Sequence, residues 1–221
     1  MIEEGGHRIP SLVDTYLFDL DGTLVDSASR IRQSLRATLR DCLDIDPDED
    51  EVARYTGVPL WDIMCAYDEG EAPRLVDYYR RYYAALGPTA PFPGVRDILD
   101  YLWEAGCGLA VVTAKGSDSA WDHLEEAELS DYFPVVVTAD EVRETKPSRE
   151  PVMRALARLD RSAARSIMIG DSAADILSGH RAGTYTGWAR WGTDRCPDFE
   201  GVRPDFTWEE PEGLMTAIRV R

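Results

Sequence analysis

The chain has 221 residues, enough for one large domain or a domain with an insert, and its composition is that of a globular protein. It carries 41 Asp plus Glu against 24 Lys plus Arg, and this net charge of −17 argues against binding nucleic acid or anionic membranes through phosphate neutralisation. No apolar run approaches the roughly 20 residues that cross a bilayer, and the acidic first residues do not resemble a signal peptide. We therefore expect a soluble, cytoplasmic protein with no nucleic-acid or membrane partner.

The basic residues are unusual, because only Lys115 and Lys146 are lysines and all the others are arginines. Two interpretations stay open: a genome that favours Arg codons, or a surface adapted to salt, where ions screen the self-repulsion of an acidic protein. In either case a phosphate ester is repelled at long range. A phosphate site in this chain must therefore be locally positive through a metal, a lysine and backbone N–H groups.

The first predicted element is a short buried strand at 14–19, which runs into a turn at 20–23. Beyond the turn the apolar residues follow helical spacing, with Ser27 as the expected N-cap of the first helix. Further helices are predicted at 49–55, 59–67 and 72–86. No strand is predicted between 27 and 90, so this segment is expected to be a helical insert.

After a proline-rich break near 88–94, helices and strands alternate strictly. The helices are predicted at 95–105, 118–127, 149–159, 173–182 and the C-terminus, and the strands at 108–113, 134–138, 166–170, 184–189 and 205–207. This alternation is typical of a parallel sheet with helices on both faces. The predicted fold class is α/β, a doubly wound, Rossmann-like core of residues 1–24 and 92–221 with a helical cap of residues 27–90 inserted after the first strand.

Four polar motifs fall at predicted strand ends or before a helix, where open α/β sheets place their ligands. The first is the run 19–27, Asp-Leu-Asp-Gly-Thr-Leu-Val-Asp-Ser; the others begin at Thr113, Lys146 and Asp171. Each alone has a structural explanation, such as a strand threonine, a surface lysine or a helix N-cap. A calcium loop is excluded for the first motif, because Leu24 and Val25 interrupt its ligand pattern. The joint occurrence of all four in this order favours a catalytic site.

In these motifs the chain resembles the haloacid dehalogenase superfamily, subfamily I, with the small helical cap, and most closely the phosphoglycolate-phosphatase-like members. The resemblance covers nearly the whole chain and implies a Mg²⁺-dependent phosphatase. It implies metal ligation by Asp19, the backbone carbonyl of Asp21 and Asp171, with Asp175 orienting a ligand or a bound water. It also implies that Thr113 Oγ, the Ala114 N–H and Lys146 hold and neutralise the phosphoryl group.

The chemistry agrees with this resemblance. Hydrolysis of a phosphate monoester is among the slowest uncatalysed reactions, and a carboxylate nucleophile divides it into two steps through an aspartyl-phosphate. Asp19 is the expected nucleophile, and Asp21 is the expected general acid and base, with Lys146 completing the catalytic set. Two departures from the family pattern, Ala114 in place of a frequent Asn and Ser148 in place of a second Pro, leave the substrate preference open.

Asp21 also separates the relatives, because dehalogenases attack carbon and lack this acid. Phosphonate-cleaving relatives need a cap lysine, and residues 27–90 contain none. The expected partner is a small phosphorylated metabolite, with phosphoglycolate as the first substrate to test and the chain acting as a monomer or homodimer. A sugar phosphomutase and a catalytically silent binding protein on the same fold stay open as alternatives.

The remaining histidines are expected to be structural, since His7 lies in the N-terminal tail and His123 and His180 fall in predicted helices away from the motifs. The segment 55–59 resembles the cap loop that faces the active site in this subfamily. It is therefore the expected specificity segment.

Overall fold

The centre of the molecule is a parallel β-sheet. The computed structural model describes residues 8–53, 55, 57–193 and 196–219. Within these residues the sheet has six strands in the order β3-β2-β1-β4-β5-β6, and every neighbouring pair is parallel. The strands are β1 Thr15–Phe18, β2 Gly108–Val112, β3 Val135–Val137, β4 Ser166–Gly170, β5 Tyr185–Ala189 and β6 Phe206–Trp208. The strand order reverses between β1 and β4, and open α/β sheets bind their ligands beyond the carboxyl ends of the strands at such a point.

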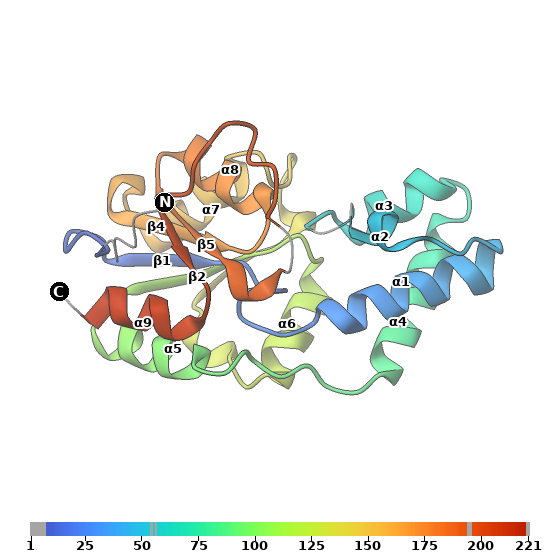
Figure 1. The fold of residues 1–221 in the computed structure, drawn as a ribbon, viewed down its shortest axis with the longest axis horizontal. Helices are drawn as coiled ribbons and strands as arrows, with labels where there is room; N and C mark the ends of the chain where they lie inside the picture. Colours follow the sequence, from blue (N-terminus) through green and yellow to red (C-terminus); the bar gives the residue numbers. More distant parts are fainter. Residues whose placement is uncertain (1–7, 54, 56, 194–195, 220–221) are drawn as a thin grey trace.

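Helices cover both faces of this sheet (Figure 1). They are α5 Val95–Glu104, α6 Ser117–Glu126, α7 Glu150–Leu159, α8 Ala173–Ala182 and α9 Pro211–Arg219, with short 3₁₀ turns η1 Ser130–Tyr132, η2 Ala139–Glu141, η3 Ala163–Arg165 and η4 Arg190–Gly192. Alternation along β1 divides the core, because Tyr16 and Phe18 pack with residues of α5, α6 and α9, whereas Leu17 packs with residues of α7. Both faces of the sheet are thus buried, and the predicted doubly wound α/β fold class is confirmed.

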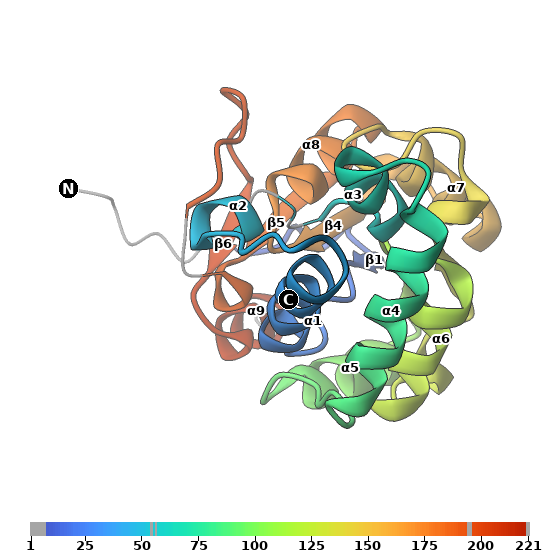
Figure 2. The same ribbon diagram turned by 90° about the vertical axis from the view of Figure 1, so that its right-hand side faces the viewer.

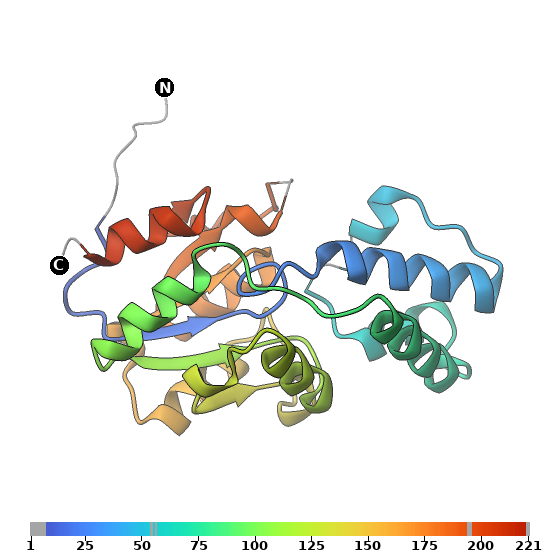
Figure 3. The ribbon, with the colours of Figure 1, turned by 90° about the horizontal axis from the view of Figure 1, so that it is seen from below.

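A second group of helices projects from the carboxyl edge of the sheet (Figure 3). It consists of α1 Ala28–Leu43, α2 Glu49–Ala53, α3 Leu60–Tyr67 and α4 Ala72–Ala85. These helices have a hydrophobic core of their own, in which Leu39, Met64 and Leu75 are fully buried. Seen from the helical side, α1 and α4 lie in front of the sheet (Figure 2).

Ser27 occupies the predicted N-cap position of α1. Ser27 precedes α1 but makes no side-chain capping bond, because its hydroxyl donates instead to Oδ1 of Asp21. The residue expected to start the helix therefore connects the helical group to the first motif. None of the helices in the described part of the chain is long and apolar enough to span a membrane.

Candidate active site

The first motif is placed by the end of β1. Asp19 directly follows this strand, and its N–H donates to the carbonyl of Ile169 in β4 at 2.9 Å. The chain then turns at Gly22, whose φ of +77° favours glycine. A Cβ on Gly22 would lie 2.5 Å from Oδ2 of Asp171. The motif loop can therefore pass directly over Asp171 only because this position has no side chain.

Lys146 connects two of the motifs at the bottom of the site. Its Nζ donates to Oδ1 of Asp19 at 2.8 Å, to Oδ1 of Asp175 at 2.6 Å and to the carbonyl of Val112 at 3.0 Å. Burial lowers the pKa of Lys146, but the two carboxylates outweigh this and raise it above its ordinary value. The ammonium therefore stays charged and holds Asp19 in one orientation.

Three buried carboxylates meet beside this lysine. One oxygen each of Asp19, Asp171 and Asp175 lies within 4.8 Å of the others. Burial, followed by the charges of Asp175 and Asp21, raises the pKa of Asp19 to about 7 against the opposing effect of Lys146, and burial raises the pKa of Asp171 well above its ordinary value. Three carboxylates against one ammonium leave excess negative charge, and carboxylate oxygens are ligands that hard divalent cations prefer. The donor set therefore fits a divalent cation.

Asp175 differs from the other two carboxylates because its oxygens are already engaged. Oδ1 accepts from Lys146, and Oδ2 accepts from the backbone N–H and the hydroxyl of Ser172 in a capping box at the start of α8. Ser172 rather than Asp171 is thus the N-cap of this helix. Asp175 is placed to orient its neighbours, and Asp171 is free of the capping role.

The side chain of Asp21 points to a different environment. It accepts from Ser27 and lies 3.1 Å from Nζ of Lys115 and 3.8 Å from Nδ1 of His123. Burial raises the pKa of Asp21, but Lys115, His123 and the hydrogen bond from Ser27 outweigh this and lower it. The two aspartates of the motif therefore serve two separate clusters, and the Asp21 side chain is left free of the three-carboxylate group.

Thr113 and Ala114 follow β2 and border the same space. Thr113 is buried, and its N–H donates to the carbonyl of Val137, which extends the β2–β3 ladder. Its Oγ1 accepts from the N–H of Lys115 at 3.1 Å, so the hydroxyl proton can point to a ligand. All the residues predicted for the site are thus brought to one edge of the sheet.

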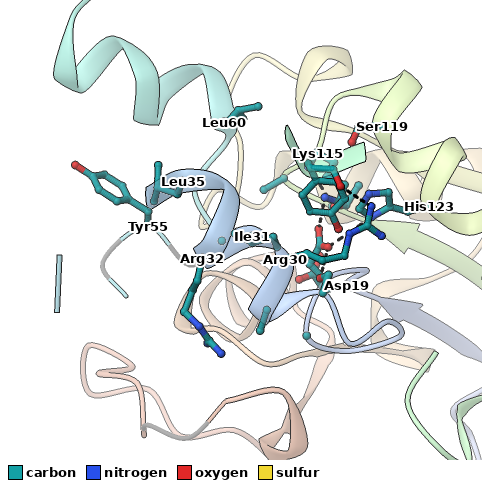
Figure 4. A pocket seen from close by; sticks show the side chains of 18 of the residues that line it. Asp19, Arg30, Ile31, Arg32, Leu35, Tyr55, Leu60, Lys115, Ser119 and His123 are labelled. Atoms are coloured by element: carbon teal, nitrogen blue, oxygen red, sulfur yellow. Dashed lines mark hydrogen bonds and ion pairs between the residues drawn. The ribbon is translucent and has the colours of Figure 1, made fainter. Parts of the chain in front are cut away.

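A cavity of about 750 Å³ lies between this edge and the helical group. Figure 4 shows Asp19, Lys115, His123 and Arg30 gathered at one end, whereas Tyr55 lies at the far end. Of the expected specificity segment, Tyr55, Gly57 and Val58 line the cavity, and Thr56 lies outside the described residues. The cavity thus joins side chains of the sheet edge and of α1–α4.

Three features of this site were not predicted from the sequence. Lys115 lines the cavity beside Asp21, and its sequence signals are its place two residues after Thr113 and the scarcity of lysines in the chain. The prediction that His123 lies away from the motifs is wrong, because α6 turns it toward Asp21; His180 is exposed, and His7 lies outside the described residues. The third feature is η4, where Gly192 lies against the motif loop.

The comparisons with known proteins agree with this geometry. The family model described as haloacid dehalogenase-like hydrolase matches residues 16–189. Pyrophosphatase PpaX of Bacillus pumilus is 31% identical over 210 residues, covering 94% of this chain and 97% of the relative. Among solved structures, a haloacid dehalogenase-like hydrolase family protein of Streptococcus pneumoniae has a TM-score of 0.79 at 25% identity, covering 93% and 98% of the two chains. A predicted phosphoglycolate phosphatase of Haemophilus somnus has a TM-score of 0.77 at 22% identity, covering 94% and 99%.

The fold and the clustered motifs define a hydrolase of the α/β type with its site at the carboxyl edge of the sheet. The chain belongs to the haloacid dehalogenase-like hydrolase family. The match to the family and the curated relatives confirm the prediction of a phosphatase enzyme.

Proposed function

We propose that the chain is a Mg²⁺-dependent phosphomonoesterase that acts on a small soluble phosphate ester through an aspartyl-phosphate on Asp19. The observation that carries the proposal is the separation of the two motif aspartates. Asp19 is fixed by Lys146 beside Asp171, while the carboxylate of Asp21 lies apart and borders the cavity. A nucleophile and an acid–base group need different positions around the phosphoryl group, and two residues of one loop have them here. In the metal-free protein the pKa of Asp19 is raised and that of Asp21 is lowered, so the charge of Mg²⁺ would ionise Asp19 and an anionic substrate beside Asp21 would raise its pKa for these roles.

The proposed reaction has two steps, transfer of the phosphoryl group to Asp19 and its hydrolysis. An oxygen of Asp19 attacks phosphorus, the bond to the leaving oxygen breaks, and Asp21 gives that oxygen a proton. Asp21 then accepts a proton from water as the water oxygen attacks phosphorus, which frees Asp19 and releases inorganic phosphate. The Thr113 hydroxyl and the Ala114 N–H donate to the phosphoryl oxygens, and Lys146 holds Asp19 in place.

Asp19, Asp171 and the backbone carbonyl of Asp21 would hold the Mg²⁺, with Asp175 behind them. When bound, Mg²⁺ supplies positive charge that lets an anionic phosphoryl group approach a carboxylate. The buried excess of carboxylates over ammonium groups supports this assignment. We assign α1–α4 as a cap over residues of the core, since the cavity is lined from both sides.

The substrate class follows from the cavity and the relatives. A volume of about 750 Å³ fits a small molecule. Phosphoglycolate is the first substrate to test, in line with the structural neighbour described as a predicted phosphoglycolate phosphatase. Inorganic pyrophosphate is the second candidate, because relatives named pyrophosphatase match this chain over nearly their whole length.

The direct test is phosphate release from a broad panel of phosphorylated metabolites and pyrophosphate. We expect turnover with Mg²⁺, none in EDTA after dialysis, and poor support by Ca²⁺, whose longer bonds and higher coordination number loosen the in-line geometry. Full activity in EDTA would contradict the proposal. Phosphate transferred to a second sugar hydroxyl instead of released would identify a sugar phosphomutase.

A further inference from the structure

Lys115 is the cation nearest to the acid–base side of the proposed reaction centre. Its Nζ lies 3.1 Å from Oδ2 of Asp21, and its side chain is only 14% exposed. It also lies 5.1 Å from the centre of the Tyr83 ring on α4. The ammonium is therefore held in a narrow place between the motif loop and the helical group, where it borders the cavity.

The other cations that line the cavity have different partners. The Arg30 guanidinium donates to Thr89, to the carbonyl of Tyr83 and to Glu126, so it is engaged between α1, α4 and α6. Arg80 lies near Asp140, whose pKa is lowered chiefly by the hydrogen bond from Thr138 and to a smaller degree by the charge of Arg80. Figure 4 shows Arg32 pointing away from the group around Asp19. Lys115 is thus the cavity cation that contacts Asp21.

Several acidic side chains share the cavity with Lys115. From α6, Asp118, Asp122, His123 and Glu126 line the same cavity. The whole chain adds a net charge of −17. An anionic group arriving beside Asp21 would be repelled by these carboxylates unless a cation lay there to receive it.

We propose that Lys115 binds an anionic substituent on the leaving group and so determines substrate specificity. This assignment rests on the proposed function. Lys115 can face the rest of the leaving group only if Asp21, its ion-pair partner, faces the leaving oxygen. The substrate class is a phosphoryl compound whose leaving group carries a carboxylate or a second phosphate close to the scissile oxygen. A lysine ammonium suits both, since it acts as a compact charge with three donors.

The kinetic test compares substrates that differ in the charge of the leaving group. Phosphoglycolate offers a carboxylate, pyrophosphate offers a second phosphate, and 2-hydroxyethyl phosphate offers neither. Lys115→Met should lower kcat/KM for the preferred substrate with an anionic leaving group by about 10- to 100-fold, which is the contribution of a hydrogen bond to a charged group. It should lower kcat/KM for 2-hydroxyethyl phosphate, whose leaving group is neutral, far less. Lys115→Arg should keep part of the preference. The substrate whose kcat/KM falls selectively shows whether Lys115 binds a carboxylate or a second phosphate.

The matched control is Arg81→Met, which removes one positive charge from the exposed face of α4, where Arg81 pairs with Asp77. It should leave the ratio between anionic and neutral substrates unchanged. An equal loss on charged and neutral substrates in Lys115→Met, or the same selective loss in Arg81→Met, would overturn the assignment of Lys115.

A binding experiment separates this proposal from the proposed function. Because the chain has only two lysines, ¹³Cε-labelled lysine gives two side-chain NMR signals, which the Lys115→Met protein assigns. With Mg²⁺, 3-phosphonopropionate or methylenediphosphonate should shift the Lys115 signal, and propylphosphonate, which lacks the second anion, should not. A Lys115 signal that does not shift with either of the two probes that carry a second anionic group would refute the proposal. Shifts without turnover of any phosphate compound would instead refute the phosphatase chemistry and leave the anion site standing.

Discussion

At the scale of single residues, Asp19 and Asp21 are separated by one position, yet among the described residues their side chains share no hydrogen-bond or ion-pair partner. Asp19→Asn keeps the shape of the side chain and removes the proposed nucleophile, so turnover should fall to background. Asp21→Asn leaves Asp19 and the backbone in place and removes only the proposed proton donor and later base. General acid–base assistance is worth about 10²–10⁴-fold, so a residual rate near that deficit should survive with an aryl phosphate, whose leaving group needs little protonation. Initial rates on aryl and alkyl phosphates measure this difference.

The covalent intermediate distinguishes the two variants further. In Asp21→Asn the attack of water would lack its proposed base, so the proposed aspartyl-phosphate should accumulate. Intact-mass spectrometry after acid quench should show one phosphate adduct on Asp21→Asn and none on Asp19→Asn. An adduct on both, or one mapped to a Ser, Thr or His, would mean that Asp19 is not the nucleophile.

The buried carboxylates also make the stability of the metal-free protein depend on pH. Burial and neighbouring carboxylates raise the pKa of Asp19 from 3.8 to about 7, so between these values the folded chain keeps a proton that the unfolded chain has lost. The contribution of Asp19 to the free energy of unfolding is therefore complete below about pH 4. It decreases by up to about 4 kcal/mol as the pH rises from about 4 through about 7. His123, whose pKa burial lowers to about 4, acts in the opposite direction, so the wild type must be compared with Asp19→Asn.

Urea unfolding in EDTA at several pH values between about 4 and 8 measures this effect. The free energy of unfolding of Asp19→Asn should rise relative to the wild type with increasing pH. Adding Mg²⁺ should stabilise the wild type most at the upper end, where the carboxylates are ionised. Parallel pH profiles for the two proteins would show that Asp19 does not titrate in this range.

The residues of the four motifs could be predicted because each stands at a strand end or before a helix, and topology then brings them together. The contacts of Lys115 and His123 with Asp21 could not be predicted. The position of His123 depends on the rotation of α6 about its axis, and that of Lys115 depends on a side-chain direction that sequence spacing does not encode. Ser27 was predicted as a cap from its residue type. Its hydroxyl finds a stronger partner in the carboxylate of Asp21.

At the scale of elements, the strands and helices follow the sequence prediction closely, because period-2 and period-3.6 patterns reflect the faces that the sheet and helices bury. The 3₁₀ turn η4 is different. Trp191 Nε1 donates to the carbonyl of Thr23 at 3.0 Å, and Trp188 Nε1 donates to the carbonyl of Asp171 at 3.1 Å. The end of β5 and η4 thus brace two motifs that lie far away in the sequence, and local patterns contain no signal for such contacts.

Gly192 tests this bracing. A Cβ at this position would lie 1.7 Å from the carbonyl oxygen of Gly22 and 2.8 Å from Cβ of Asp171, and neither atom can move without displacing a motif. Gly192→Ala should cost about 1–3 kcal/mol of stability and lower kcat by at least about tenfold through displacement of Asp171. The control is Gly70→Ala, where the nearest atom is Oδ1 of Asp68 at 3.4 Å. Thermal melts and phosphate release measure both, and equal behaviour of the two variants would show that η4 does not brace the site.

At the scale of the whole molecule, the helical group contacts the core close to the site. A Cβ on Gly57 would lie 3.1 Å from the Ser172 hydroxyl, so this loop of the helical group reaches the start of α8 beside Asp171. Arg30 of α1 bonds to Thr89 in the returning chain and to Glu126 of α6. If α1–α4 form the proposed cap, contacts on both sides of the cavity would restrict what can reach Asp19 and exclude water during chemistry.

This arrangement predicts strong discrimination by size. A phosphate on a folded protein cannot reach Asp19 unless the contacts near Gly57 and Arg30 open, whereas a metabolite fits a cavity of about 750 Å³ with the cap in place. We expect kcat/KM for phosphoglycolate-sized esters to exceed that for a phosphoserine protein by at least about 100-fold, because substrate binding energy would be spent on opening the cap. Free O-phosphoserine controls for the chemistry of the ester, and it should react far faster than the same group in a folded protein. Equal rates on the free amino acid and the phosphoprotein would mean that α1–α4 do not close over the site.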